Sequence, residues 1–190
     1  VVSDHAPEQE FSALRALVHL RNIARSPRPV GSSENERVRR YLVETLRREG
    51  VDVRVLKGSA VRTLIPRVHA AGNVYNVLAV IPGKRKDSFL FLTHYDSVPT
   101  GPGAADNGAS VVSALETIRA LSREKPQYTL QFLFTDGEEA GLLGAESFAS
   151  QAENTANVVA VFDFEARGIS GESFLFQTGK KSSGLLQAFL

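Results

Sequence analysis

Three short apolar segments of this chain have the character of buried β-strands, and each is followed by side chains that can bind metal ions. The segments cover residues 88–93, 128–135 and 158–164. Continuous apolar runs are typical of strands that helices cover on both faces. The side chains that follow are, in chain order, His94 with Asp96, Glu138 with Glu139, and Glu165. Strands of a parallel sheet end at a common edge, so we expect the chain to fold with these groups close together.

Helical patterns alternate with these segments, which indicates an α/β fold. The clearest helix runs to Gly50, after Ser33 and Glu36 in a capping-box pattern. We expect other helices at residues 8–25, 107–121 and 183–190, and other strands at residues 51–56, 73–81 and 173–178, with an irregular basic stretch from 57 to 72. The sequence therefore predicts an α/β three-layer sandwich with a central mixed, largely parallel sheet flanked by helices.

Composition narrows the class of protein. At 190 residues and 43% hydrophobic residues, the chain is expected to form one domain over residues 1–190. A helical pattern is cut off at Leu190, so we expect this domain to be incomplete at its C-terminal side. The net charge of +1 provides no basic surface for nucleic acid, so a small or peptide substrate is expected. The chain begins at Val1 without methionine, which suggests a processed segment with any membrane anchor outside it.

The acidic residues at the strand ends call for a cation. Carboxylates that converge on one sheet edge repel one another unless a metal ion lies between them. The chain has no cysteine, so the ligands must be His, Asp and Glu. Asp106, in the Gly/Pro loop after Asp96, is suited to bridge two zinc ions, and Asp96 is placed to hold the second ring nitrogen of His94. Of Glu138 and Glu139, one can bind metal while the other acts as a general base.

Other motifs lead to weaker hypotheses. Residues 101–106 approach a dinucleotide-binding loop, but Asp106 replaces the last glycine and would repel a pyrophosphate. The sequence contains neither a His-Glu-x-x-His motif nor a Gly-x-Ser-x-Gly motif, which argues against the commonest single-zinc proteases and serine hydrolases. We interpret His5, His19 and His69 as surface or packing residues.

Four motifs, in order, resemble those of the co-catalytic di-zinc aminopeptidases of metallopeptidase clan MH. They are His94-Tyr95-Asp96-Ser97, the segment from Gly103 to Ala109, the segment from Thr135 to Gly141, and Phe164-Glu165-Ala166-Arg167-Gly168. The last motif and the Phe-Gln-Thr-Gly at residues 176–179 are most similar to the branch of the endoplasmic-reticulum metallopeptidase and the vacuolar membrane protease, with their bacterial relatives. This resemblance implies an extracytoplasmic location, secreted, periplasmic or lumenal, with or without a membrane anchor.

The resemblance also implies a role for each site residue. His94 and Glu165 would bind one zinc ion, Glu139 the other, and Asp106 both; Asp96 would orient His94, and Glu138 would be the base. A cis peptide bond at Asp106–Asn107 is implied as well. The family's second zinc takes a histidine downstream of Glu165, which this chain lacks. We therefore expect two zinc ions in the full-length protein and one or none in this chain, which would then have little or no activity.

The implied function is a zinc-dependent exopeptidase, an aminopeptidase that removes N-terminal residues from peptides through a metal-bound hydroxide with Glu138 as the base. One alternative is a glutaminyl-cyclase-like aminoacyl transferase, although Asn107-Gly108-Ala109 argues against it. A non-catalytic peptidase-like ectodomain and a carboxypeptidase specificity also remain open. We further expect an uncovered apolar patch near the C-terminal side, which favours self-association.

Overall fold

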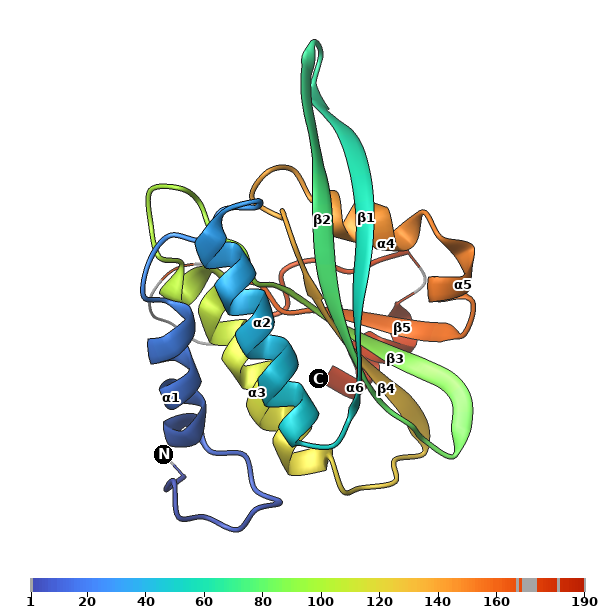
Figure 1. The fold of residues 1–190 in the computed structure, drawn as a ribbon. Coiled ribbons are helices and arrows are strands. Elements are labelled where there is room, and N and C mark those ends of the chain that lie inside the picture. The colour runs from blue at the N-terminus through green and yellow to red at the C-terminus, as the bar shows by residue number, and fades with distance from the viewer. Residues whose placement is uncertain (1, 167, 169–173, 181, 190) are drawn as a thin grey trace.

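The fold is a mixed β-sheet between two layers of helices, as predicted (Figure 1). The computed structural model describes residues 2–166, 168, 174–180 and 182–189. Within them, the strands are β1 (Asp52–Ile65), β2 (Val68–Ile81), β3 (Arg85–His94), β4 (Tyr128–Thr135) and β5 (Val158–Asp163). Their order in the sheet is β1-β2-β4-β3-β5. Strand β3 runs parallel to both β4 and β5, whereas β2 is antiparallel to β1 and β4.

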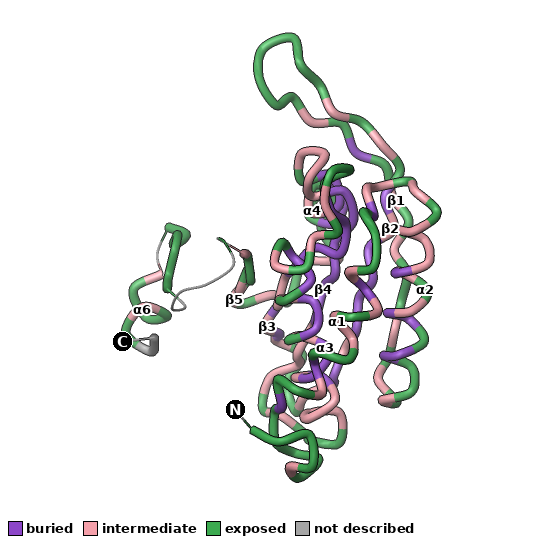
Figure 2. Tube along the Cα trace, turned by 90° about the vertical axis from the view of Figure 1, so that its left-hand side faces the viewer, coloured by how far each residue is buried: buried purple, intermediate pink, exposed green. Residues whose placement is uncertain are grey.

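The helices divide between the two faces of the sheet. On one face lie α1 (Ala13–Ile23), α2 (Ser33–Arg48) and α3 (Ser110–Leu121), and on the other lie α4 (Leu143–Ala149) and the short α5 (Ala152–Thr155). The larger core joins α1, α2 and α3 to the sheet through residues such as Leu42, Ile118 and Phe134. A smaller core joins Phe148 of α4 to Leu90 and Leu133 on the opposite face. Figure 2 shows the buried residues concentrated between these layers.

Three helix starts differ from the predictions. Helix α3 begins at Ser110 and not at residue 107, because Asp106 and Asn107 leave helical geometry. Helix α1 begins at Ala13, five residues after Glu8, because the side chain of Ser12 accepts a hydrogen bond from the backbone N–H of Arg15. Helix α2 is capped by Ser32, whose hydroxyl accepts from the N–H of Asn35, and the expected pair of Ser33 and Glu36 does not form the cap. Gly50 follows α2 with φ +75°, a conformation that ends a helix at little cost for glycine.

The expected irregular stretch from 57 to 72 is wrong. Strands β1 and β2 pair from Asp52 opposite Val80 to Ile65 opposite Val68, forming a long hairpin whose tip extends beyond the rest of the sheet (Figure 1). Gly58 lies within it because a Cβ atom there would stand 1.9 Å from Oγ of Ser147 in α4. A glycine that weakens a strand locally here allows a helix to pack closely against it.

The C-terminal part matches the predictions less well. Residues 174–178 form no strand, contrary to the expectation for residues 173–178, and Ser173 lies outside the described residues. Helix α6 (Ser183–Phe189) begins where the pattern predicted a helix. None of the helices in the described part of the chain combines the length and the apolar character that a membrane span requires.

Aromatic side chains hold the parallel strands together. The ring of Phe91 in β3 stacks on Phe132 of β4 at 4.9 Å and on Phe162 of β5 at 5.4 Å between ring centroids. The three strands that precede the predicted metal ligands are therefore tied side by side, and their carboxyl ends share one edge of the sheet.

Candidate metal centre

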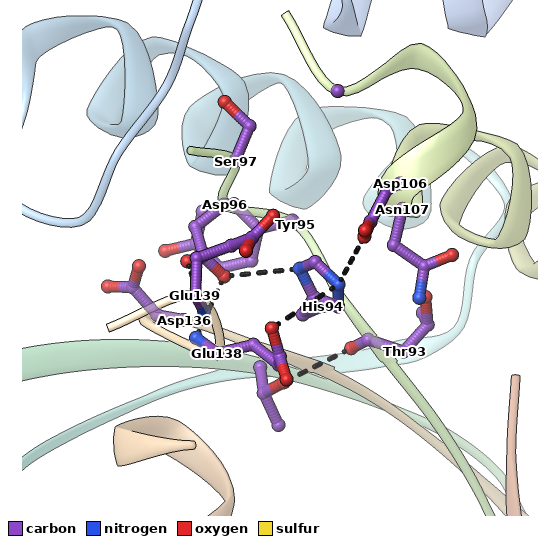
Figure 3. Close-up of polar contacts among 12 residues, drawn as sticks. Thr93, His94, Tyr95, Asp96, Ser97, Asp106, Asn107, Asp136, Glu138 and Glu139 are labelled. Carbon is purple, nitrogen blue, oxygen red and sulfur yellow. Dashed lines mark hydrogen bonds and ion pairs between the residues drawn. The ribbon is translucent and has the colours of Figure 1, made fainter. Parts of the chain in front are cut away.

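His94, the last residue of β3, stands at the centre of the acidic cluster. Its side chain is only 2% exposed. Nε2 lies 3.0 Å from Oδ1 of Asp106, 3.5 Å from Oε1 of Glu165 and 3.8 Å from Oε2 of Glu138. Figure 3 shows the ring between Asp96 on one side and Asp106 on the other. One imidazole nitrogen thus faces three carboxylates that come from different parts of the chain.

Asp96 connects His94 to the acidic pair after β4. Its carboxylate is fully buried, and Oδ1 lies 3.4 Å from Nδ1 of His94. The same carboxylate accepts hydrogen bonds from the backbone N–H groups of Glu138 at 3.0 Å and Glu139 at 3.2 Å. Asp96 therefore holds the start of the loop that carries the two glutamates, and its carboxylate lies next to the His94 ring.

Asp106 and Glu165 lie in two segments that are distant in sequence, and the side chain of Asn107 links these segments. The peptide bond between Asp106 and Asn107 is cis, as predicted. Both residues leave helical geometry inside the π-helical turn η1 (Ala104–Ala109), just before α3. The buried side chain of Asn107 donates from Nδ2 to the carbonyl oxygen of Phe164 at 2.8 Å. This bond brings the chain that precedes α3 next to the residue before Glu165.

The geometry suits a zinc ion. The possible ligand atoms form two groups, and within each group they lie within 4.8 Å of one another. One group is His94 with Asp106 and Glu165, and the other is His94 with Glu138 and Glu139. Zinc binds such atoms at ~2.0 to 2.2 Å, so two ligands of a tetrahedral ion are roughly 3.3 to 3.6 Å apart. The distances of 3.0 and 3.5 Å from Nε2 of His94 are close to this range. The side chains of Asp106 and Glu165 are 56% and 45% exposed, which leaves the site open to solvent.

Burial and mutual repulsion alter the acidity of the glutamates. The pKa of Glu138 is raised to about 7, chiefly because its carboxyl group is partly buried; His94 opposes the shift and Glu165 adds to it. Burial also raises the pKa of Glu139, and the negative charge of Asp106 contributes. A carboxyl group that titrates near neutral pH can accept and return a proton under physiological conditions.

The pKa of the His94 imidazole is also raised, but for a different reason. Burial lowers the pKa of His94, but the carboxylates of Asp96 and Glu165 outweigh this effect and raise the pKa to about 11. The metal-free ring is therefore protonated at neutral pH. A metal ion that binds Nε2 must displace this proton, so binding is coupled to proton release.

The structure adds a buried polar network that the sequence did not predict. Oδ1 of Asp136 accepts from Nδ2 of Asn35 at 2.9 Å, and Oδ2 accepts from the N–H of Tyr75 at 3.0 Å. The hydroxyl of Tyr95 donates to the carbonyl of Tyr75 at 2.9 Å. Burial raises the pKa of Asp136 to about 6. This network supports both Tyr95, which is next to His94, and the loop of Glu138. The one sign of the network in the sequence was the carboxylate of Asp136 within the motif of residues 135–141.

The other histidines take the packing and surface roles expected of them. Nδ1 of His19 lies 2.6 Å from the hydroxyl of Tyr41, and Nδ1 of His69 lies 3.0 Å from the hydroxyl of Thr63 in the hairpin. His5 is exposed in the N-terminal segment. Across the described residues, both candidate ligand groups use His94 as their histidine.

Comparisons of the amino-acid sequence relate this chain to known peptidases. Residues 76–190 match the family described as Peptidase family M28. Endoplasmic reticulum metallopeptidase 1 of Rattus norvegicus is 33% identical, and the match covers 95% of this chain and 22% of that protein. The vacuolar membrane protease of Schizosaccharomyces japonicus is 34% identical, with 88% of this chain and 21% of that protein covered. The chain thus spans about a fifth of the length of these relatives.

Solved structures share the fold. A glutaminyl cyclase from Porphyromonas gingivalis superposes with a TM-score of 0.77 at 25% identity, over 94% of this chain and 68% of that chain. An aminopeptidase from Aneurinibacillus sp. strain AM-1 superposes with a TM-score of 0.72 at 14% identity, over 86% and 72% of the two chains. The same framework therefore supports enzymes with different reactions.

Proposed function

Because the chain belongs to peptidase family M28, we propose that it is the metal-binding domain of a zinc-dependent aminopeptidase. The observation that carries the proposal is the convergence of His94, Asp106 and Glu165 on one side and of Glu138 and Glu139 on the other. These residues come from the carboxyl ends of β3, β4 and β5 and from the turn before α3. A cluster of carboxylates around one buried imidazole is a donor set for a divalent ion.

Each residue has a role in this proposal. His94, Asp106, Glu165 and Glu139 would hold the metal, and a bound zinc ion supplies Lewis-acid polarisation of a carbonyl and acidifies a water molecule. Glu138, with its pKa near 7, would take a proton from the attacking water and pass it to the leaving amine. Asp96 holds the His94 ring in the orientation that exposes Nε2 to the cluster. We propose two ions for the full-length protein and at most one for this chain.

The proposed substrate is a peptide with a free amino terminus. The exposed side chains of Asp106 and Glu165 leave the metal site open to a peptide from solvent. The two relatives are named for the endoplasmic reticulum and the vacuolar membrane, and we extend an extracytoplasmic location to this chain. The near-neutral net charge supports a peptide rather than a nucleic-acid partner.

A panel of aminoacyl nitroanilides tests the activity. The full-length protein, loaded with zinc, is expected to hydrolyse substrates with a free amine and to leave their N-acetylated forms intact. Metal content is measured in the same samples for both the full-length protein and the 190-residue chain. Hydrolysis of N-blocked peptides from their carboxyl end would instead identify a carboxypeptidase, and a metal-free, inactive full-length protein would point to a non-catalytic ectodomain.

A glutaminyl cyclase is the second candidate, favoured by the structural likeness to the Porphyromonas gingivalis enzyme. A peptide that begins with glutamine separates the two reactions. An aminopeptidase releases free glutamine and a shortened peptide, whereas a cyclase releases ammonia and leaves the peptide at full length with a cyclised first residue. Mass spectrometry of the products decides between them, and the segment Asn107-Gly108-Ala109 leads us to expect release of glutamine.

A further inference from the structure

Arg28 is a fully buried arginine that is bonded to backbone carbonyls. It lies between α1 and α2, in the segment Pro27-Arg28-Pro29, and its relative exposure is 0%. Nε donates to the carbonyl oxygen of Tyr95 at 2.6 Å, and Nη2 donates to that of Gly103 at 3.0 Å. Nη1 donates to the carbonyl oxygen of Pro102. The planar guanidinium thus bonds to carbonyls in two separate stretches of the chain.

These two stretches are the segments that carry His94 and Asp106. Tyr95 directly follows His94, and Gly103 lies three residues before Asp106. The main chain of Arg28 adds to the link, because its N–H donates to Oγ of Ser97 at 2.9 Å and its carbonyl accepts from the N–H of Ser97 at 3.3 Å. The guanidinium therefore spans the loop that separates two of the proposed metal ligands.

The loop is packed tightly against this guanidinium. Gly103 has φ +57°, and a Cβ atom there would stand 2.3 Å from the backbone oxygen of Asp106 and 3.3 Å from Nη1 of Arg28. The carbonyl of Gly103 also accepts from the N–H of Gly108 at 3.0 Å, within η1. The position of Asp106 is thus coupled to Arg28 through one carbonyl group.

Arginine has the chemistry that this position needs. Burial lowers the pKa of Arg28 to about 10, and the negative charges of Asp96, Asp106 and Glu139 oppose the shift, so the group stays charged at neutral pH. Its rigid fork of donors can satisfy carbonyls in two segments at once, whereas the single ammonium group of lysine lies on a flexible stem. A Lys substitution therefore retains the charge and removes the fork.

We propose that Arg28 is a positioning residue of the metal centre, which sets the separation of His94 and Asp106 by bonding the segments that carry them. This inference rests on the proposed function for its consequence, which is metal binding. The hydrogen bonds from Arg28 to the two segments, which we call the clamp, exist in the metal-free chain. Arg28 contacts no reacting group. Its effect on the ligands passes through the carbonyls of Tyr95, Pro102 and Gly103.

Hydrogen exchange on the metal-free chain tests the clamp directly. We expect Arg28→Lys to accelerate amide exchange in residues 95–108 and to leave the amides between β2 and β4 protected as in the parent. Arg119→Lys is the matched control, because Nη1 and Nη2 of Arg119 donate to the carbonyls of Glu8 and Glu10 near the far end of α3. It should loosen the N-terminal segment instead. Parent-like exchange over residues 95–108 in Arg28→Lys would overturn the proposal.

Cobalt binding tests the consequence for the ligands. Arg28→Lys is expected to weaken Co²⁺ binding by about 10- to 100-fold, as for residues that orient metal ligands, and to change the visible spectrum of the saturated protein. Arg119→Lys should keep the parent affinity and spectrum. A parent affinity in Arg28→Lys, or equal losses in both variants, contradicts a positioning role. If the full-length protein binds no Co²⁺ or Zn²⁺, the proposed function fails, and the exchange data still decide the role of the Arg28 hydrogen bonds.

A second variant covers the case in which Arg28→Lys does not fold. Gly103→Ala keeps the guanidinium but inserts a Cβ atom against the backbone oxygen of Asp106. We expect faster exchange in residues 95–108 and weaker Co²⁺ binding from this change as well. Native exchange and native affinity in Gly103→Ala would show that the loop does not depend on this packing and would overturn the proposal.

Discussion

The side-chain amide of Asn107 donates a hydrogen bond to the backbone carbonyl of Phe164, with 2.8 Å between Nδ2 and the oxygen. The first residue follows Asp106 and the second precedes Glu165, so one bond links the segments that carry the two exposed candidate ligands of the His94 cluster. The ends of β3 and β5 are adjacent in the sheet, and this hydrogen bond links the turn before α3 to the residue after β5.

We predict that Asn107→Ala weakens metal binding. The carbonyl of Phe164 loses its donor, which costs about 0.5 to 1.5 kcal/mol, and Glu165 is no longer held beside Asp106. Calorimetric titration with zinc measures the affinity, and thermal unfolding measures the stability. Asn154→Ala is a matched control, because Nδ2 of Asn154 in α5 donates to the carbonyl of Phe148 in α4 at 3.0 Å. Equal effects of the two substitutions on zinc affinity would contradict the prediction.

The two adjacent glutamates should respond differently to the same substitution. Glu138→Gln in the full-length protein is expected to keep its metal and lose about 10²- to 10⁴-fold in turnover, since an amide cannot accept the proton of the attacking water. Glu139→Gln should lose metal instead. Elemental analysis and nitroanilide hydrolysis measure the two properties. Normal activity of both variants would show that the base and the ligand are assigned wrongly.

The raised pKa values of Glu138, Asp136 and His94 should lower the stability of the metal-free chain as the pH rises, against a smaller opposite contribution from His19, whose pKa is lowered by burial. The folded state raises the pKa of Glu138 from 4.5 to about 7 and that of Asp136 from 3.8 to about 6. A raised pKa means that folding favours the protonated form, so this contribution is complete below the unfolded pKa and disappears as the pH passes the folded pKa. His94, raised from 6.5 to about 11, continues the trend at higher pH.

Thermal unfolding without metal at about pH 5 and about pH 8 measures this trend, with a lower melting temperature expected at the higher pH. Saturating zinc should reduce or reverse the difference, because the ion replaces the protons among the carboxylates and binds better as the protons leave. Glu138→Gln removes one titrating group and should flatten the metal-free trend. A melting temperature that rises from acid to neutral pH without metal would contradict the raised pKa values of Glu138 and Asp136.

The sequence predicted those elements whose signal is local. Strands β3 and β4 are continuous apolar runs, and the residues that follow them could be assigned to one sheet edge before any coordinates were known. The hairpin of β1 and β2 was missed between 57 and 72 because its exposed, basic and glycine-containing residues have little local strand character. Its pairing comes from the partner strand and from α4, which packs against Gly58.

The site residues also separate into those that the sequence could identify and those that it could not. His94, Asp96, Asp106, Glu138, Glu139 and Glu165 lie in short motifs, so the sequence could name them, and the structure brings them together. Arg28 and Asp136 were not singled out, because a charged side chain becomes buried only through contacts that are distant in sequence. The carbonyls around Arg28 are 67 to 75 residues away in the chain. Two flanking prolines were the one local sign of a constrained arginine.

The final prediction concerns β5, an edge strand of the sheet in the described part of the chain. Val159 and Val161 point away from the core and are 55% and 52% exposed, and Phe164, just after the strand, is 52% exposed. An exposed apolar edge strand offers unpaired backbone groups to a second chain. We therefore propose that the 190-residue chain self-associates through β5.

Sedimentation velocity over a range of protein concentrations should show reversible association of the parent chain. Val161→Lys is expected to shift the equilibrium toward monomer, because a charge on the edge strand must be desolvated when a second chain pairs with it. Val18→Lys is the control, since Val18 is 63% exposed but lies on helix α1. It should associate as the parent does. A parent chain that stays monomeric at all concentrations, or equal loss of association in both variants, would mean that β5 is not the contact.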